Sequence, residues 1–263
     1  MAGVVTARRS LLPLAVLRVL AERCEVPLPP GWGADPAEAP GGHGAAARLL
    51  VEAGLVSESG EPREGLREAL SPLRTPLLTL DVSLAPVAER APMPADQPAA
   101  AFTGAVVVGE RALVGLLRRD GVPLAELSLA APEALGPSVE RLLAAVPTAP
   151  PAASVQERIT LAAFVALSVF EGRFDPDRFA AVHGCDADAA ARVAALLGET
   201  TATLQVLVVG DRSVPAPPVG QVLFYRTAAG WLEAATEGDD VVLRSTEPIA
   251  ALPAVTALVA GAL

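Results

Sequence analysis

One order of helical, strand and turn segments occurs twice along this chain of 263 residues. Each copy has helices, an apolar strand, a second strand, a hairpin that ends in Gly, a third strand and a closing helix marked by Pro. The copies span residues 44–146 and 154–263, and few residues are identical between them. A duplicated unit of this kind pairs its halves about a pseudo-twofold axis. We therefore predict an α+β fold with a central, mostly antiparallel sheet flanked by helices.

The repeat also predicts how the chain is organised. We expect a single domain, residues 1–263, made of two quasi-equivalent halves at about 1–147 and 154–263. The strands and closing helix of the first half are expected at Leu77–Leu84, Ala105–Val108, Ala112–Leu117, Leu124–Leu129 and Pro132–Val146. Those of the second are expected at Thr203–Val209, Gln221–Arg226, Trp231–Ala235, Val241–Arg244 and Glu247–Leu263. Pro-rich excursions at 85–103 and 211–220 take the same place in each half.

Residues near the N-terminus can be interpreted in two ways. Arg8-Arg9-Ser10 before the apolar run from Leu11 to Leu17 imitates a twin-Arg export signal. Arg18 interrupts that run, however, and no clean cleavage site follows. The alternative is a helix over 11–20 with Ser10 as its N-cap and Pro13 in its first turn. Apolar residues recur there at helical spacing, so we predict the helix.

Other helices are marked by apolar spacing and by capping residues. Leucines that fall on one face predict a helix over Glu61–Leu73. Ser154–Phe170 is predicted to be one long helix whose apolar residues cover most of its circumference, which indicates a central or interfacial position. Asp175-Pro176 is a strong helix start, with Asp as N-cap and Pro in the first helical position. Asp186 or Asp188 begins the helix after it.

Composition limits the kinds of partner. The formal net charge is −10 and all 20 basic residues are Arg, without a basic stripe, so no nucleic-acid partner is expected. An acidic surface suits a cytoplasmic protein. The two cysteines, Cys24 and Cys185, are far apart in sequence and fit reduced thiols. No apolar run reaches the roughly 20 residues of a membrane span, so no membrane insertion is expected.

Residues that could carry chemistry are few. His43 lies in a Gly-rich loop that has neither the preceding strand nor the Lys-Ser/Thr of a phosphate loop. His183-Gly184-Cys185-Asp186 supplies too few ligands for zinc and predicts a corner between two helices. Asp81 lies inside an apolar strand, where a carboxylate is costly unless it is paired. We therefore predict no enzyme, no catalytic residue, no metal and no cofactor. An enzyme of unknown class that uses Asp81 or His183 is the alternative.

The second hairpin carries several large side chains. Strand alternation places Phe224 and Arg226 on one face and Tyr225 on the other, and Trp231 follows the turn. One face has to cover helices. The other face could then meet a partner, unless both faces belong to an ordinary core.

The spacing of apolar residues in the first half resembles that of a known family. The pattern is Leu49-Leu50-x3-Gly54-Leu55-Val56, then Leu66-x3-Leu70-x2-Leu73-x2-Pro76-Leu77-Leu78-x-Leu80-Asp81-Val82. It is similar to the N-terminal region of the EspG family, which is associated with ESX (type VII) secretion. Val222–Arg226, Gly230-Trp231-Leu232 and the closing helix also follow in the order of that family. The resemblance extends over nearly the whole chain but includes no catalytic motif.

The resemblance implies a single EspG-like domain that acts as a cytoplasmic chaperone. Such a chaperone holds PE–PPE heterodimers soluble before secretion by covering the hydrophobic tip of the PPE helices. The partner expected here is a PE–PPE-like or WXG-type secreted helical protein. Our candidate partner-binding residues lie in the second-half sheet and the 154–170 helix, namely Phe164, Phe170, Phe224, Arg226 and Trp231. The remaining alternative is a structural domain that self-associates through its sheet edge, for example as a homodimer.

Overall fold

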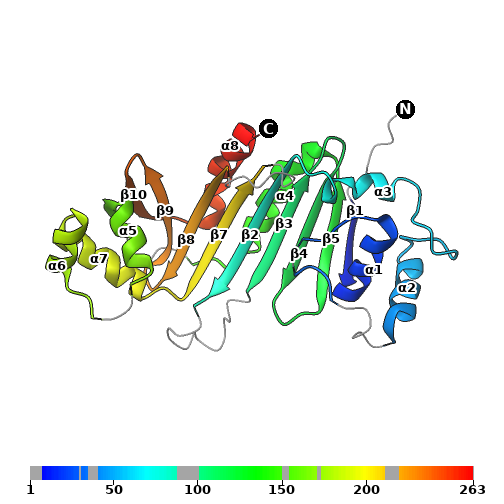
Figure 1. Cartoon of the computed structure of the whole chain (residues 1–263), viewed down its shortest axis with the longest axis horizontal. Coiled ribbons are helices and arrows are strands. Elements are labelled where there is room, and N and C mark those ends of the chain that lie inside the picture. Colours follow the sequence, from blue (N-terminus) through cyan, green and yellow to red (C-terminus); the bar gives the residue numbers. More distant parts are fainter. Residues whose placement is uncertain are drawn as a thin grey trace.

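A computed structural model describes residues 8–29, 31–34, 41–87, 101–149, 154–170, 173–210 and 219–262. Ten strands form one sheet in the order β1-β5-β4-β3-β2-β7-β8-β9-β10-β6 (Figure 1). Every neighbouring pair is antiparallel. The strands are β1 (Arg8–Pro13), β2 (Leu78–Pro86), β3 (Phe102–Val108), β4 (Leu113–Arg119), β5 (Leu124–Ala130), β6 (Gln156–Thr160), β7 (Ala202–Val209), β8 (Gly220–Thr227), β9 (Gly230–Glu237) and β10 (Asp240–Ser245).

The strand order has the twofold symmetry that the sequence repeat predicts. β2 and β7 pair at the centre of the sheet. From β2 the order runs outward through β3, β4 and β5 to β1, and from β7 through β8, β9 and β10 to β6. The predicted α+β class with a central antiparallel sheet is confirmed. The domain boundary near residues 148–153 stays a prediction.

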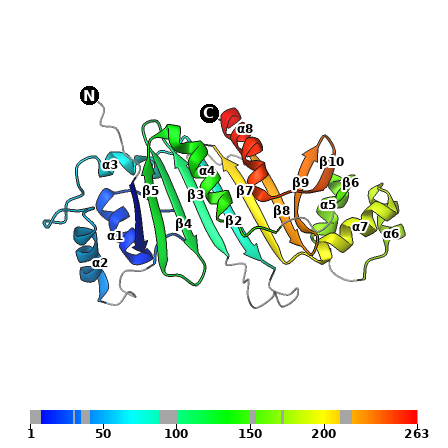
Figure 2. The ribbon, with the colours of Figure 1, turned by 180° about the vertical axis from the view of Figure 1, so that it is seen from behind.

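Helices cover both faces of the sheet. They are α1 (Leu14–Cys24), α2 (Gly42–Glu52), α3 (Leu66–Ala69), α4 (Leu135–Ala144), α5 (Leu161–Ser168), α6 (Pro176–His183), α7 (Ala187–Gly198) and α8 (Leu252–Ala262). Helices α4 and α8 lie on one face, which is in front in Figure 2. The opposite face is covered by α1 and α2 at the β1 end and by α5 and α7 at the β6 end. In the described part of the chain, no helix is long and apolar enough to cross a bilayer.

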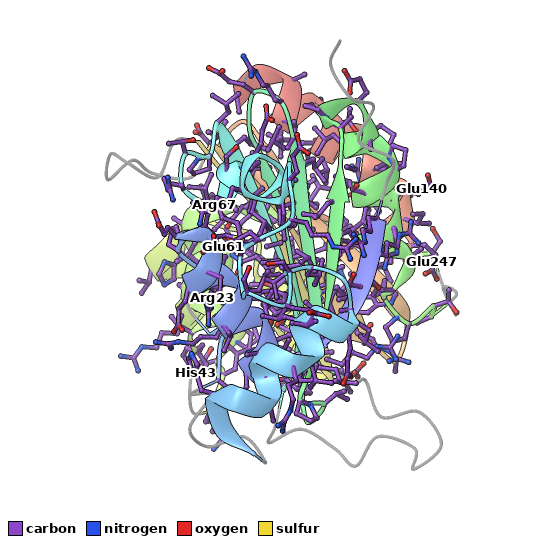
Figure 3. The ribbon with its side chains drawn as sticks, turned by 90° about the vertical axis from the view of Figure 1, so that its right-hand side faces the viewer. Arg23, His43, Glu61, Arg67, Glu140 and Glu247 are labelled. Atoms are coloured by element: carbon purple, nitrogen blue, oxygen red, sulfur yellow. The ribbon has the colours of Figure 1, made fainter. Side chains whose placement is uncertain are left out.

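Three apolar clusters hold these layers together. On the α4–α8 face, Leu80 and Val82 of β2 and Val206 of β7 are completely buried. On the opposite face, separate clusters lie beneath α1–α2 and beneath α5–α7. Figure 3 shows the layers from the side: Arg23, Glu61 and Arg67 lie on one side of the sheet and Glu140 of α4 on the other. Apolar side chains alternate along β2 and β7, so one face of these strands forms the core.

The helix predicted over residues 11–20 is wrong at its N-terminal end. Residues Arg8–Pro13 form strand β1, which pairs with β5, and the helix begins at Leu14 with Pro13 as its N-cap instead of Ser10. Proline disfavours a helical conformation in the residue before it, so Leu12 stays extended. The strand also satisfies the outer backbone groups of β5.

The long helix predicted for Ser154–Phe170 is wrong in its first third. Residues Gln156–Thr160 form edge strand β6, and α5 begins only at Leu161. The Thr160 side chain accepts a hydrogen bond of 3.3 Å from the Ala163 amide and so caps α5. Ile159 alternates with polar neighbours, which is the period of a strand.

The helix predicted for Glu61–Leu73 is mostly absent. It is reduced to α3 and a 3-10 turn, Ser71–Leu73, because Gly65 is left-handed (φ 78°) and Pro72 breaks the run. The capping predictions farther along are confirmed. Asp175 accepts from the Arg178 amide and Asp186 from the Ala189 amide. Most of the two Pro-rich excursions lies outside the described residues.

Candidate partner-binding surface

No described segment covers the middle of the sheet between the two groups of helices. There β2 and β7 present polar or partly exposed side chains, including Ser83 and Gln205, which are directly opposite each other in register. The Gln205 side-chain amide donates a hydrogen bond of 3.3 Å to Gln221 on β8. This strip is bordered on the β6 side by α5 and α7 (Figure 1).

Helix α5 exposes an apolar stripe beside this strip. Its inner face buries Ala163, Phe164 and Leu167. Leu161, Val165 and Val169 recur every four residues along its outer side, and their exposures are 42%, 53% and 74%. Residues at this spacing lie above one another on a helix. The helix is therefore apolar on the side that faces solvent as well as on the side that faces the core.

A hollow of about 720 Å³ lies where the chain passes from α5 to α6. Its aromatic lining is a chain of rings, in which Phe170 contacts Phe174 (centroids 5.7 Å apart), Phe174 contacts Phe179 (5.4 Å) and Phe179 contacts His183 (4.3 Å). Val182, 71% exposed, also lines it. Offset and edge contacts between aromatic rings are favourable, so they hold such a cluster in a fixed shape while the hollow stays open.

The rim of this aromatic hollow is basic. Arg173 and Arg178 both line it and are exposed, and Asp175 is used as the N-cap of α6. The surface therefore combines an apolar floor with cations at its edge. Such a site suits an apolar projection that carries acidic neighbours.

The structure separates the five predicted contact residues. Phe170 lies in the aromatic hollow and is 39% exposed. Phe164, Phe224 and Trp231 are buried, so their expected contact with a partner is corrected to a role in the core. Phe164 packs edge-on against Tyr225 under α5, while Phe224 and Trp231 lie beneath α4 and α8. Both faces of β8 are covered, as the ordinary-core interpretation expected.

Arg226 takes an intermediate position. It is half-buried on β8, opposite Trp231 of β9, and its Nη1 atom is buried without a hydrogen-bond partner among the described residues. Tyr225 lies on the other face of β8. Its burial raises the pKa of the phenol to about 12.

Sequence reasoning missed most of the exposed surface. Val165, Val169 and Val182 carry no motif, and Phe174 and Phe179 were not singled out. One signal was available: the apolar residues of 154–170 cover most of the predicted helix circumference, which is typical of a helix in a central or interfacial position. The outer face of α5 could not be placed from the sequence, because the helix predicted over 154–170 includes residues 156–160, which form β6.

The enzyme alternative, which uses either Asp81 or His183, stays untested, and these two residues lie in separate parts of the fold. Asp81 is half-buried in central strand β2, whereas His183 ends α6 at one end of the molecule (Figure 1). Burial raises the pKa of both Cys24, to about 11, and Cys185, so neither is a ready thiolate. Among the described residues, no group of three His, Cys, Asp or Glu side chains could hold a metal ion.

Known proteins match this chain in fold and not in sequence. No family model matches it, and no curated protein is significantly similar in sequence. Its fold is similar to that of a solved type VII secretion system chaperone. One of the matching solved structures is that of the Mycobacterium tuberculosis chaperone EspG5 in complex with the PE25–PPE41 dimer. The TM-score is 0.65 at 13% identity, over 96% of this chain and 96% of that chain. The resemblance predicted from apolar spacing is thus confirmed at the level of the fold.

Proposed function

We propose that this chain is a cytoplasmic chaperone of type VII secretion that binds the apolar tip of a PE–PPE-like helical client before export. The observation that carries the proposal is the exposed apolar surface of α5 and α6, made of the Leu161–Val169 stripe and the aromatic hollow. The shared fold supports it, because EspG5 was solved with a PE–PPE dimer.

The physical argument begins with exposure. Single exposed apolar residues are normal, but a contiguous patch on a soluble protein indicates a binding surface. Val165, Val169 and Val182 are all more than half exposed. Fully burying a Val or Leu side chain contributes roughly 1.5–3 kcal/mol. A few such residues are enough for a specific interface, because a minority of contacts carries most of the binding free energy.

The shape of the surface favours a helical client. A helical hairpin presents a narrow apolar tip, and a hollow beside a helix stripe is the complementary form. The Arg173–Arg178 rim favours a client with acidic residues next to that tip. The polar central strip can then accept the polar flank of the client. Covering the tip would prevent the client from aggregating.

Co-purification tests the function. The chain is expressed with a tag in an actinobacterium that encodes PE–PPE and WXG-type proteins, and the proteins that elute with it are identified and quantified. A stoichiometric PE–PPE pair that precipitates when expressed without the chaperone is the expected result. A WXG-type partner would correct the client class. Recovery of the chain alone, as a monomer or homodimer, would contradict the proposal.

A further inference from the structure

A second hollow lies on the opposite face of the molecule, beneath α4. Its volume is about 130 Å³, and it is bounded by α4, by strands β3, β4 and β5, and by edge strand β1. Its inner wall is apolar, with Val106, Leu117 and Leu142. Gly115 contributes no side chain to it, so the floor between β3 and β5 stays open. The chaperone surface proposed above does not include this face.

The wall of this hollow contains an ordered ion pair. The Arg141 guanidinium of α4 pairs with the Glu126 carboxylate of β5, and its Nη1 donates to the Ser128 hydroxyl at 3.3 Å. Ser128 in turn donates to Glu126 at 3.0 Å. The side chains of Arg141 and Glu126 are only 30% and 24% exposed, so this pair is shielded from solvent. Glu126 is therefore neutralised and Arg141 is held in one orientation.

Arg9 supplies an additional cation at the same place. It is directly opposite Ser128 in the β1–β5 register, so both side chains are on the α4 face. Arg9 lines the hollow and forms no ion pair with any described residue. Its neighbour Arg8 also borders the hollow, but the guanidinium of Arg8 is engaged elsewhere and donates to the Ala53 carbonyl at 3.0 Å. The hollow thus has a net positive charge in a chain whose formal net charge is −10.

We propose that this hollow binds a carboxylate attached to a small branched hydrocarbon group. The carboxylate would bind the guanidinium of Arg9, which suits bidentate recognition, with Arg141 nearby. The hydrocarbon would lie against Val106, Leu117 and Leu142. A cavity of roughly 150 Å³ accommodates a molecule the size of benzene, so about six non-hydrogen atoms fit here. Inorganic phosphate would gain nothing from the apolar wall.

Two sources carry this chemistry: a free short-chain acid and the C-terminal leucine or valine of a polypeptide. The probes that distinguish them are isovalerate and the tripeptide acetyl-Gly-Gly-Leu with a free carboxylate. Isovaleramide and the corresponding peptide amide serve as neutral controls. Binding is followed through the NMR signals of the Val106, Leu117 and Leu142 methyl groups in the full chain. If isovalerate binds and the peptide does not, the natural ligand is a free acid. If the peptide binds more tightly, the ligand is the C-terminus of a polypeptide. Either result supports the site.

Variants connect binding to the proposed geometry. Arg9→Gln is expected to weaken binding at least tenfold, whereas the matched variant Arg8→Gln should change it less than twofold. Ser138→Leu, which places a larger side chain from α4 into the hollow, should abolish binding while the melting temperature confirms folding. The proposal is overturned if neither acid shifts the methyl signals, if the amides bind equally well, or if Arg8→Gln has the same effect as Arg9→Gln.

Discussion

The indole Nε1 of Trp231 donates a hydrogen bond of 2.9 Å to the carbonyl oxygen of Pro147. Trp231 is the second residue of β9 in the second half, and Pro147 follows α4 at the end of the first. The side chain is 1% exposed and lies in the cluster beneath α4 and α8. The buried Trp231 side chain thus attaches the end of the first half, where the connection to the second half begins, to the sheet.

Trp231→Phe should therefore destabilise the whole fold. Phenylalanine keeps an aromatic ring in the core but leaves the Pro147 carbonyl without its donor, which costs about 1–3 kcal/mol. Trp231→Ala also opens a cavity and should cost about 3–5 kcal/mol. Urea unfolding measures both. Equal stability of Trp231→Phe and the unaltered chain would show that the hydrogen bond contributes nothing.

Glycines on β3 and β8 lie close to leucine side chains of α4 and α8. A Cβ on Gly104 would lie 2.8 Å from Leu142 of α4, and one on Gly220 would lie 2.5 Å from Leu258 of α8. Gly104→Ala should lower the free energy of unfolding by about 1–3 kcal/mol, because Leu142 is buried and has little room to move. Gly220→Ala should cost less than Gly104→Ala, because Leu258 is only partly buried and its side chain can shift. The control is Gly136→Ala in α4, where no neighbour lies within 4 Å. It should be neutral or should stabilise the helix by up to about 1 kcal/mol. A similar loss in all three would contradict the packing argument.

The N-cap of α7 can be tested with a neighbouring aspartate as control. Asp186 accepts a hydrogen bond of 2.7 Å from the Ala189 amide, whereas Asp188 lies in the first turn without capping. Asp186→Ala should destabilise the chain by about 1 kcal/mol. Asp188→Ala loses an interaction with the helix dipole, worth about 0.3–1 kcal/mol, and an exposed coulombic attraction to Arg192. Thermal unfolding distinguishes them, and a larger loss for Asp188→Ala would show that the cap is misassigned.

Cys24 should make stability depend on alkaline pH. Burial raises the pKa of its thiol from 9.0 to about 11, so the folded state favours the protonated form. The stability that the folded state gains from the protonated Cys24 thiol is complete below pH 9 and is lost as the pH rises towards 11. The free energy of unfolding should thus fall over this range, and Cys24→Ala should fall less steeply. If the free energy of unfolding falls equally with pH in the unaltered chain and in Cys24→Ala, Cys24 is not the cause of the fall.

Sequence patterns could predict the central strands because each has a clear alternation and a turn signal at its end. β2, β7 and β8 begin within two residues of their expected positions. The edge strands β1 and β6 could not be predicted, because each is short and runs directly into a helix, so the apolar pattern of the helix extends into the strand. In both cases a residue at the junction, Pro13 or Thr160, marks the true helix start.

The candidate surface was harder to predict for a different reason. Large aromatic residues such as Phe224 and Trp231 attract attention, but in a chain with 3% aromatics they are needed for the core. The exposed surface combines valines with the phenylalanines of the hollow, and neither residue type shows in sequence whether it is buried or exposed. Only the register of α5 against the sheet shows that Val165 and Val169 face outward.

The proposed client-binding surface on α5 and α6 can be tested directly. Isothermal titration of the chain with a PE–PPE dimer measures this most directly, with Val169→Glu and Val182→Glu as test variants. Val122→Glu is the control, because Val122 is also exposed (43%) but lies in the β4–β5 turn at the other end of the sheet. We predict that the two test variants weaken binding at least tenfold, about 1.4 kcal/mol, while the control binds normally. Equal affinity for all three variants would contradict the account.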